Sequence, residues 1–486
     1  MTGRERTSTS ALVAEPGPEL ERLEKRGDRF VLLAALDDRS ALYLSFGPEG
    51  YTPFVAAGPN LPDAAARFPA AASYQVEAGE LHGLAFAGRE PEAGVRGLFV
   101  HRGGAHGAGG RSAVEGPELA LPEPPYRGEA VLRIPFGPVR DATVESLMHR
   151  FHYLGERILT LEQHLGYKHR GAEDGLRRAT LATLPVYAER VSGPNAVAFA
   201  LAACQAVERA SDVTVPPRAE GLRAILAELE RAYNHFRDIG RIAASTTLRV
   251  GSAQGHALQE WTQRIGARLT GHRFLRGAVA VGGLRRDLDV DGLAVEVSRL
   301  EADARAYIEA LEATELFVDR LETTGVLTPE RARAWGAVGP VGRGSGVDVD
   351  VRRDAAYGAY RGLGFDVPTR MTGDAMARFR VRCEEVLTSL YLVRELTETL
   401  SAGAVMGERP SALPEDVLML GWAEGPRGEV VAALTTDARG ALARAVLRDG
   451  SRHNWPLFPD TVTDTYLMDY AINEASWGLT VASHDR

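Results

Sequence analysis

Cys204 and Cys383 are the two cysteines of the chain, and they lie far apart in the sequence. Thiolates are the donors that soft metal ions and iron–sulfur clusters prefer, and such a cluster normally takes four of them. This chain alone therefore cannot build a four-thiolate metal or iron–sulfur site, and no disulfide framework is implied. Each cysteine is expected to be a buried, small apolar residue rather than a reactive thiol.

Acid–base and ionic side chains come close together at His169, Arg170 and Glu173. A buried carboxylate has a shifted pKa, so Glu173 could relay protons. The alternative is a structural arginine–glutamate ion pair that orients the start of a helix. Asp350 and Arg352 have a spacing that places both on one face of an extended segment, and this predicts a structural ion pair.

The bulk composition limits the possible partners. The chain has 486 residues, 45% of them hydrophobic and 25% charged, which is typical of a soluble globular protein with two or three domains. A net charge of −9 argues against nucleic acid as the main partner. The segment from Met1 to Glu15 has no apolar core, and no uncharged apolar run approaches the roughly 20 residues of a membrane span. We therefore expect a cytoplasmic protein without a membrane span, which reaches membranes only through partners.

Two nucleotide-like glycine segments lack the necessary context. The sequences GGLRRD and GRGSG do not sit between a strand and a helix, as a dinucleotide-binding fingerprint requires. Any NADH is therefore expected to bind on another subunit.

Short strands and turns characterise the first part of the chain. RFVLLAALDD and SALYLSFGPEG are two strand-like runs that meet at the Asp37–Ser40 turn, and residues 64–86 favour a helix or a loop. Residues 16–101 are predicted to form a small α/β domain. Residues 102–127, rich in glycine and proline without periodicity, are predicted to be a linker.

Helical patterns dominate the third region, residues 128–486. It opens with a predicted strand pair over 128–163. A long helix is expected after the Pro216–Pro217 pair, because apolar residues then recur every three or four positions: Leu222, Ile225, Leu226, Leu229, Tyr233 and Phe236. Residues 291–325 and 375–400 repeat this pattern. The predicted fold is α+β, a small α/β domain followed by a mainly α-helical bundle with peripheral β-hairpins.

Several motifs in order resemble one known family. The chain carries GYKHRGAED, VPPRAEGLRAILAELERAYNHFRDIG, GPVGRGSGVDVDVR and WAEGPRGE, within about Gly137 to Asp464. These segments are similar to those of complex I 49-kDa-type subunits and of membrane-bound nickel–iron hydrogenase large subunits, including the energy-converting hydrogenase-related proteins. Residues Ala72 to Arg89 are similar to the signature of the complex I 30-kDa-type subunit, which implies a fusion of the two subunits.

The resemblance implies a site from which the metal ligands are missing. Hydrogenases of this family hold nickel and iron with two C-x-x-C pairs. The first pair falls on Ser192 and Asn195, and the second is placed on Ala475 and Gly478. A nickel–iron centre is therefore expected to be absent, and no metal is expected on this chain. Ser192 and Asn195, facing the old cavity from a helix, could hydrogen-bond a small polar ligand or be neutral fillers.

In complex I proteins the vacated cavity holds a quinone, whose oxygens are bound by a His and a Tyr. This chain has Arg140 in FGPVRD and Gly193 at those positions. Arg140 could donate to a quinone carbonyl but cannot pass on a proton. Arg427 in EGPRGE would approach the cavity, or it would cap its loop and pair with Glu424 or Glu429.

By the same resemblance, His169, Arg170 and Glu173 stand where the family has a proton-transfer segment. His235 faces the interior of the bundle and is expected to be a satisfied core histidine. Asp350 and Arg352 could instead couple the chain to a membrane partner.

Two functions remain open on these grounds. The first is a redox subunit that takes electrons from an iron–sulfur small subunit to quinone or another small acceptor, at the inner face of the plasma membrane. The second is a non-catalytic scaffold between that iron–sulfur subunit and an ion-pumping membrane arm. A hydrated cavity would favour the first function, and filling by Phe199 or Trp477 would favour the second.

Overall fold

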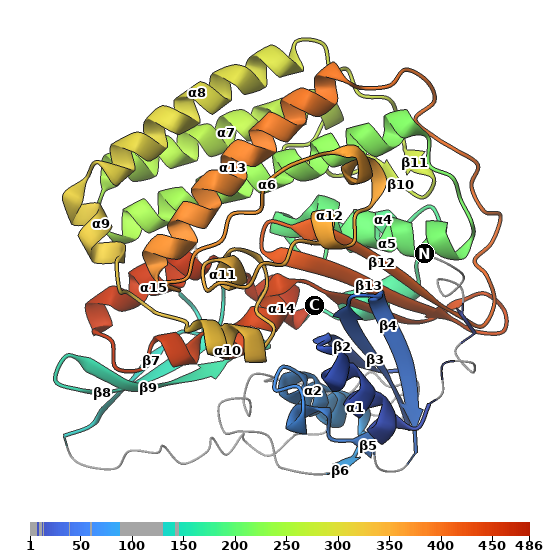
Figure 1. Cartoon of the computed structure of the whole chain (residues 1–486), viewed down its shortest axis with the longest axis horizontal. Helices are drawn as coiled ribbons and strands as arrows, with labels where there is room; N and C mark the ends of the chain where they lie inside the picture. The colour runs from blue at the N-terminus through green and yellow to red at the C-terminus, as the bar shows by residue number, and fades with distance from the viewer. Residues whose placement is uncertain are drawn as a thin grey trace.

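The computed structural model describes residues 7–8, 12, 14–37, 39–58, 61–87, 130–140 and 145–486. Three layers are visible in Figure 1: long helices, a sheet crossing the middle of the molecule, and the small N-terminal unit on the opposite side of that sheet. The expected combination of an α/β unit with a larger, mainly helical one is confirmed. The predicted linker over 102–127, and residues 88–101 of the predicted first domain, lie outside the described residues.

The N-terminal unit is built on an antiparallel sheet in the order β2-β3-β4. The two strand-like runs are confirmed as β2 and β3, and residues 64–86 contain a short 3-10 turn followed by a helix. Buried apolar residues face α1 and α2 across the sheet. The elements are α1 (Pro16–Arg26), β2 (Arg29–Ala35), β3 (Ser40–Gly47), β4 (Gly50–Ala57), β5 (Leu61–Pro62), η2 (Ala64–Ala66), α2 (Ala71–His82) and β6 (Phe86–Ala87); β1 (Thr7–Ser8) pairs with a distant strand, β12 (Val417–Gly425).

The buried carboxylate of Glu429 joins this unit to the rest of the chain. It accepts hydrogen bonds from Arg29, 2.7 Å away, and from the Tyr51 hydroxyl, also at 2.7 Å, and it pairs with Arg448. Burial alone would raise the pKa of Glu429, but Arg29 and Arg448 hold it well below its usual range. The joint is therefore an ionic cluster with partners from both ends of the sequence.

The predicted strand pair over 128–163 is a three-stranded sheet in the order β7-β8-β9. The segment thus contains one strand more than the predicted pair, because the chain turns at Gly137–Pro138 after the first strand and pairs again beyond it. The strands are β7 (Leu132–Phe136), β8 (Met148–Leu154) and β9 (Arg157–His164). This sheet lies at the edge of the molecule, as expected of a peripheral hairpin (Figure 1).

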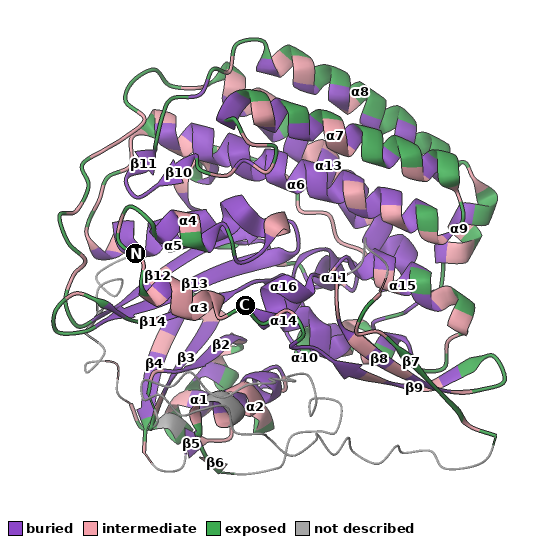
Figure 2. Ribbon diagram, turned by 180° about the vertical axis from the view of Figure 1, so that it is seen from behind, coloured by how far each residue is buried: buried purple, intermediate pink, exposed green. Residues whose placement is uncertain are grey.

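The long helices form the outer layer, and α6 lies innermost. The predicted helix after Pro216 is confirmed, with Pro217 as its first residue and its apolar face fully buried. Figure 2 shows α6 buried along most of its length, whereas α8 exposes one side. The four helices are α6 (Pro217–Ser245), α7 (Arg249–Thr270), α8 (Leu293–Glu312) and α13 (Ala375–Glu398).

Helix α5 (Ala196–Ala210) is apolar on nearly all sides and lies on the middle sheet. Its residues pack on β12 and β13 (Gly428–Thr436), beside which lies β14 (Leu442–Arg448). Close approach requires Gly421, because a Cβ there would meet the Ala202 carbonyl oxygen at 2.0 Å. The β12–β13 hairpin is thus buried between layers and is not peripheral, in contrast to the expectation for the hairpins of this region.

Short elements connect these layers. Before α13 they are α3 (Ala172–Arg177), α4 (Leu184–Ala188), η3 (Gly193–Asn195), β10 (Val279–Ala280), β11 (Gly283–Leu284), α9 (Glu315–Leu321), α10 (Pro329–Ala334), α11 (Gly339–Arg343), α12 (Val351–Asp354) and η4 (Gly358–Gly362). After β14 they are α14 (Gly450–Asn454), η5 (Trp455–Leu457), η6 (Pro459–Thr461), η7 (Leu467–Asp469), α15 (Tyr470–Trp477) and α16 (Val481–Asp485). Among the described residues, no helix combines the length and apolarity needed to cross a membrane.

Candidate functional site

Two short polar segments meet at the start of α5. Ser192 directly precedes η3 and Asn195 is its last residue; they contact Thr480, which precedes α16, and Ser483, which lies within it. The Ser192 and Thr480 hydroxyl oxygens are 3.5 Å apart, and the Asn195 amide nitrogen lies 3.3 Å from the Ser483 hydroxyl. All four side chains are buried. We refer to Ser192, Asn195, Thr480 and Ser483 as the polar quartet.

The quartet corrects the placement of the second ligand pair. Ala475 and Gly478, the expected positions, lie in and directly after α15, and the residues opposite Ser192 and Asn195 are Thr480 and Ser483. A placement counted forward from residues 460–464 falls short of Thr480, because η7 and α15 lie between them. The three-residue spacing of Thr480 and Ser483, which matches that of Ser192 and Asn195, was the signal that could have found them.

Ser192 and Asn195 do not share a helix face as expected. Ser192 has an extended backbone, with φ −150° and ψ 131°, and precedes η3. The Asn195 amide donates to Asp449 at 2.5 Å as well as to Ser483, while its carbonyl oxygen has no partner among the described residues. Burial raises the pKa of Asp449, which also accepts a hydrogen bond from the backbone N–H of Arg452.

The donor set decides the metal chemistry. Three hydroxyls and one amide are neutral, hard donors, whereas a nickel–iron centre needs bridging thiolates. The quartet therefore does not fit that centre. Both cysteines are buried elsewhere, as predicted, and burial raises the pKa of each thiol. The described residues contain no cluster of three or more histidine, cysteine, aspartate or glutamate side chains arranged to hold a metal ion.

Arg427 lies buried behind the quartet with partners that were not expected. It donates to the Gly478 carbonyl at 2.7 Å, to Asn234 at 3.2 Å and to Asp238 at 3.5 Å. The predicted pairing with Glu424 or Glu429 is wrong, because those carboxylates bind other arginines. Burial lowers the pKa of Arg427 to about 10. Its hydrogen bonds hold the loop before Thr480 against α6.

His235 is a core histidine, as predicted. Its Nε2 lies 2.8 Å from a Glu385 carboxylate oxygen, and burial lowers the pKa of His235. Glu385 also accepts from Arg343 at 2.7 Å. The expected ion pair of Asp350 and Arg352 is present at 2.6 Å, with Asp350 capping α12. These residues belong to a buried ionic network rather than to the quartet.

His169 and Arg170 position both halves of the quartet. The His169 Nδ1 donates to the Asp485 carbonyl at 2.8 Å, next to the Ser483 segment. Arg170 donates to the Val191 carbonyl, directly before Ser192. These two residues therefore act on the backbone around the site.

Glu173 does not form the expected pair with Arg170. It accepts a hydrogen bond from the Leu447 backbone N–H at 3.1 Å and pairs with Arg486 at 3.2 Å. The alternative interpretation of Glu173 as a structural ion-pair residue holds, but with a partner from the far end of the sequence.

Arg140 lines a cavity of about 50 Å³ that borders the quartet at Thr480. Arg140 is almost fully buried, pairs with Glu474 at 2.6 Å and donates twice to the Glu145 carbonyl. Trp477 forms part of the cavity wall, while Phe199 is buried in α5. The full lining is Arg140, Glu145, Arg237, Arg241, Trp455, Phe458, Glu474, Trp477, Leu479, Thr480 and Val481.

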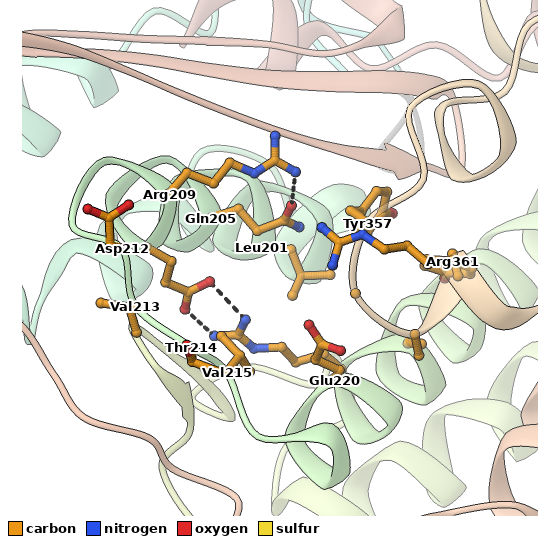
Figure 3. Close-up of a pocket in the computed structure, with 16 residues that line it drawn as sticks. Leu201, Gln205, Arg209, Asp212, Val213, Thr214, Val215, Glu220, Tyr357 and Arg361 are labelled. Atoms are coloured by element: carbon orange, nitrogen blue, oxygen red, sulfur yellow. Dashed lines mark hydrogen bonds and ion pairs between the residues drawn. The ribbon is translucent and has the colours of Figure 1, made fainter. Parts of the chain in front are cut away.

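A larger cavity of about 410 Å³ lies between the end of α5, the start of α6 and η4 (Figure 3). None of the predicted site residues lines it. Two pairs of polar side chains in its lining bind each other: Arg223 forms an ion pair with Glu208 at 2.6 Å, and Arg209 donates a hydrogen bond to Gln205 at 3.2 Å. This cavity is separate from the quartet.

Comparisons with known proteins agree with the observed fold. The family described as the 49 Kd subunit of respiratory-chain NADH dehydrogenase matches residues 253–420. The chain is 31% identical to formate hydrogenlyase subunit 5 of Escherichia coli, over 69% of this chain and 60% of that protein. It is 30% identical to the carbon monoxide-induced hydrogenase of Rhodospirillum rubrum, over 66% of this chain and 90% of that protein.

Two further similarities extend over most of the matched proteins. The NADH-quinone oxidoreductase subunit 4 of Thermus thermophilus is 30% identical, over 68% of this chain and 87% of that protein. A chain of an archaeal respiratory membrane complex, the membrane-bound sulfane sulfur reductase, superposes with a TM-score of 0.70 at 23% identity, covering 74% of this chain and all of that chain. The last similarity bears on the fold alone.

Proposed function

Because this chain belongs to the family of the respiratory-chain NADH dehydrogenase 49-kDa subunit and its hydrogenase relatives, we propose that it is the large redox subunit of a membrane-associated complex. It would take electrons from an iron–sulfur small subunit and pass them to quinone or another small acceptor, without a nickel–iron centre. Membrane-arm subunits would hold it at the inner face of the plasma membrane.

The observation that carries this proposal is that the quartet remains polar, buried and clustered. Burying hydroxyl and amide groups is costly unless they are hydrogen-bonded, so a site with no remaining task would be cheaper to fill with apolar side chains. Asn195 still has a carbonyl oxygen without a partner among the described residues. The quartet thus offers hydrogen-bonding groups that include Ser192 and Asn195, the positions to which the resemblance assigns the first ligand pair of hydrogenases.

The size of the neighbouring cavity favours a small acceptor. A volume of about 50 Å³ has room for a few water-sized groups and is too small for a quinone ring within this chain. Arg140, which would donate to a quinone carbonyl, already binds Glu474 and the Glu145 carbonyl. A quinone would therefore need space that the iron–sulfur partner supplies, whereas a smaller acceptor would not.

A non-catalytic scaffold is the second candidate. Trp477 occupies part of the wall next to Thr480, and Arg427 is fully engaged in structural hydrogen bonds. Both observations fit a site that has been closed. In that case the chain would link the iron–sulfur subunit to an ion-pumping membrane arm and would pass no electrons to an acceptor.

The deciding experiment uses the whole membrane complex. We would measure nickel content and the rate of reoxidation by quinones and by small inorganic acceptors, for the natural chain and for Ser192→Ala. The matched control is Ser298→Ala, an exposed serine on α8 whose hydroxyl bonds only to its own helix.

If the chain is a redox subunit, the complex should turn over without nickel. Its turnover rate should fall about tenfold in Ser192→Ala, since the loss of one hydrogen bond to the acceptor changes the rate by roughly that factor. Ser298→Ala should keep the rate of the natural complex. An assembled complex whose turnover is the same in both variants and in Asn195→Leu would overturn the redox assignment in favour of the scaffold.

A further inference from the structure

Arginine is in excess around the small cavity next to Thr480. Its lining includes three guanidinium groups, those of Arg140, Arg237 and Arg241, and two carboxylates, those of Glu145 and Glu474. Arg237 and Arg241 are four residues apart on α6, so their side chains lie on one face of that helix. Like charges at this spacing destabilise a helix unless something balances them.

Both lining carboxylates are already committed. Glu474 binds Arg140 at 2.6 Å. Glu145 accepts from the Thr480 hydroxyl at 2.9 Å, and from the backbone N–H groups of Val481 and, at 2.8 Å, Ala482. It therefore caps the start of α16; its charge favours the protonated form of Arg237, but no hydrogen bond or ion pair joins its carboxylate to a described arginine side chain.

The carboxylate beneath the cavity is also shared. Asp238 accepts from Arg237 at 3.0 Å, and Arg427 and Arg382 approach it at 3.5 Å and 3.8 Å. Burial alone would raise the pKa of Asp238, but the surrounding arginines lower it to about 2. Asp238 is therefore ionised, and its charge attracts Arg241 without a direct hydrogen bond or ion pair between the two side chains.

Arg241 has no hydrogen bond or ion pair with any residue that the structure describes. Burial lowers the pKa of Arg241, and the neighbouring charge of Arg237 lowers it further, while the carboxylates of Asp238 and Glu474 act in the opposite direction. Arg241 is half-buried, and none of its nitrogens is fully enclosed, so its guanidinium keeps its hydrogen-bonding capacity open to the cavity. Its position in the wall of a cavity leaves room for a partner from outside the chain.

We propose that this cavity binds a small inorganic or one-carbon anion, held by Arg241 and Arg237 beside Thr480. The volume of about 50 Å³ suits an anion of up to about four non-hydrogen atoms. A planar oxyanion matches the two parallel N–H groups of a guanidinium. Anion binding is argued from the cavity alone. The role of the anion as electron acceptor, or as the product of its reduction, rests on the proposed function.

Formate is the probe, because formamide is its uncharged isostere. Binding of each to the full chain would be followed by ligand NMR titration. For a three-atom ligand we expect a dissociation constant no lower than about 1 mM. Formate should bind saturably, and formamide at least tenfold more weakly.

Arg241→Gln should weaken formate binding at least tenfold. Arg264→Gln, which changes an exposed arginine of α7 paired with Glu260, should leave it unchanged. Without anion, Arg241→Gln should unfold at a higher temperature than the natural chain, because a repelled and unpaired cation has been removed. This second readout shows that the variant is folded.

Equal binding of formate and formamide, or unchanged formate binding in Arg241→Gln, would overturn the anion site. Since the titration needs no electron donor, its failure leaves the redox proposal standing. Loss of the redox proposal, with formate binding intact, would leave the anion site standing as a feature of a scaffold.

Discussion

The hydroxyl oxygens of Ser192 and Thr480 lie 3.5 Å apart, although 288 positions separate the two residues in the sequence. Asn195 and Ser483, with the same separation, make a second contact of this kind at 3.3 Å. Two segments with equal internal spacing thus face each other across the start of α5. The two contacts bring two pairs of residues with the same spacing together, with oxygen and nitrogen atoms where a thiolate centre would have sulfur.

Replacing the quartet with cysteines should restore metal binding. In the quadruple variant Ser192→Cys, Asn195→Cys, Thr480→Cys and Ser483→Cys, the four thiolates would converge on one point, and we expect Zn²⁺ to bind more than ~100-fold more tightly than to the natural chain. The measurement is a competition titration against a chromophoric chelator. A variant with Cys at 192, 195 and 475 is the control, and equally tight binding to it would contradict the placement of Thr480 and Ser483.

Gly421→Ala should destabilise the contact between α5 and the middle sheet. The new Cβ would meet the Ala202 carbonyl oxygen at 2.0 Å, and a backbone atom cannot rotate away. We expect a loss of about 1–3 kcal/mol in the free energy of unfolding, measured by urea denaturation. Gly364→Ala, where nothing lies within 4 Å, is the control. Equal midpoints for the two variants would show that the layers can separate without cost.

Stability should depend on pH through Glu429. Its pKa is lowered in the folded protein by Arg29 and Arg448, so its contribution is present above its unfolded pKa, near 4.5, and is lost as the pH falls. The stability difference between the natural chain and Glu429→Gln should therefore shrink below pH 4.5, by up to about 1.4 kcal/mol per pH unit. Urea titrations at several pH values measure it. A constant difference down to pH 3 would speak against an ionised, paired Glu429.

Glu230 should have the opposite effect. It accepts backbone N–H groups of Val197 and Ala198 at 2.8 Å and 3.0 Å, and burial raises its pKa to about 8. A carboxyl with a raised folded pKa contributes stability that is complete below its unfolded pKa and is lost as the pH rises through the folded value. Relative to Glu230→Gln, the natural chain should lose stability between about pH 5 and pH 8. A flat difference across that range would place its pKa near the ordinary value.

Local sequence patterns predicted most helices and strands, because the formation of these elements depends largely on residues that are close in the sequence. The apolar spacing of Leu222 and Tyr233, for example, is enough to identify α6. The partners of Arg427 could not be predicted, since Asp238 lies far away in sequence and any carboxylate near position 427 looked equally suitable. Thr480 and Ser483 were missed for a related reason: the number of residues in η7 and α15 is set by packing, and no spacing rule fixes it.

The shared carboxylate of Glu429 has a consequence for how the N-terminal unit and the rest of the chain are connected. Arg29 and Tyr51 bind it from the N-terminal unit, and Arg448 binds it from β14 of the middle sheet. These contacts do not depend on the peptide segment that links the N-terminal unit to the rest of the chain. The N-terminal unit and the rest of the chain, expressed as separate polypeptides, should assemble into a heterodimer with the same interface. Fusion into one chain would then fix their ratio at one to one and raise their effective concentration, without changing what holds them together.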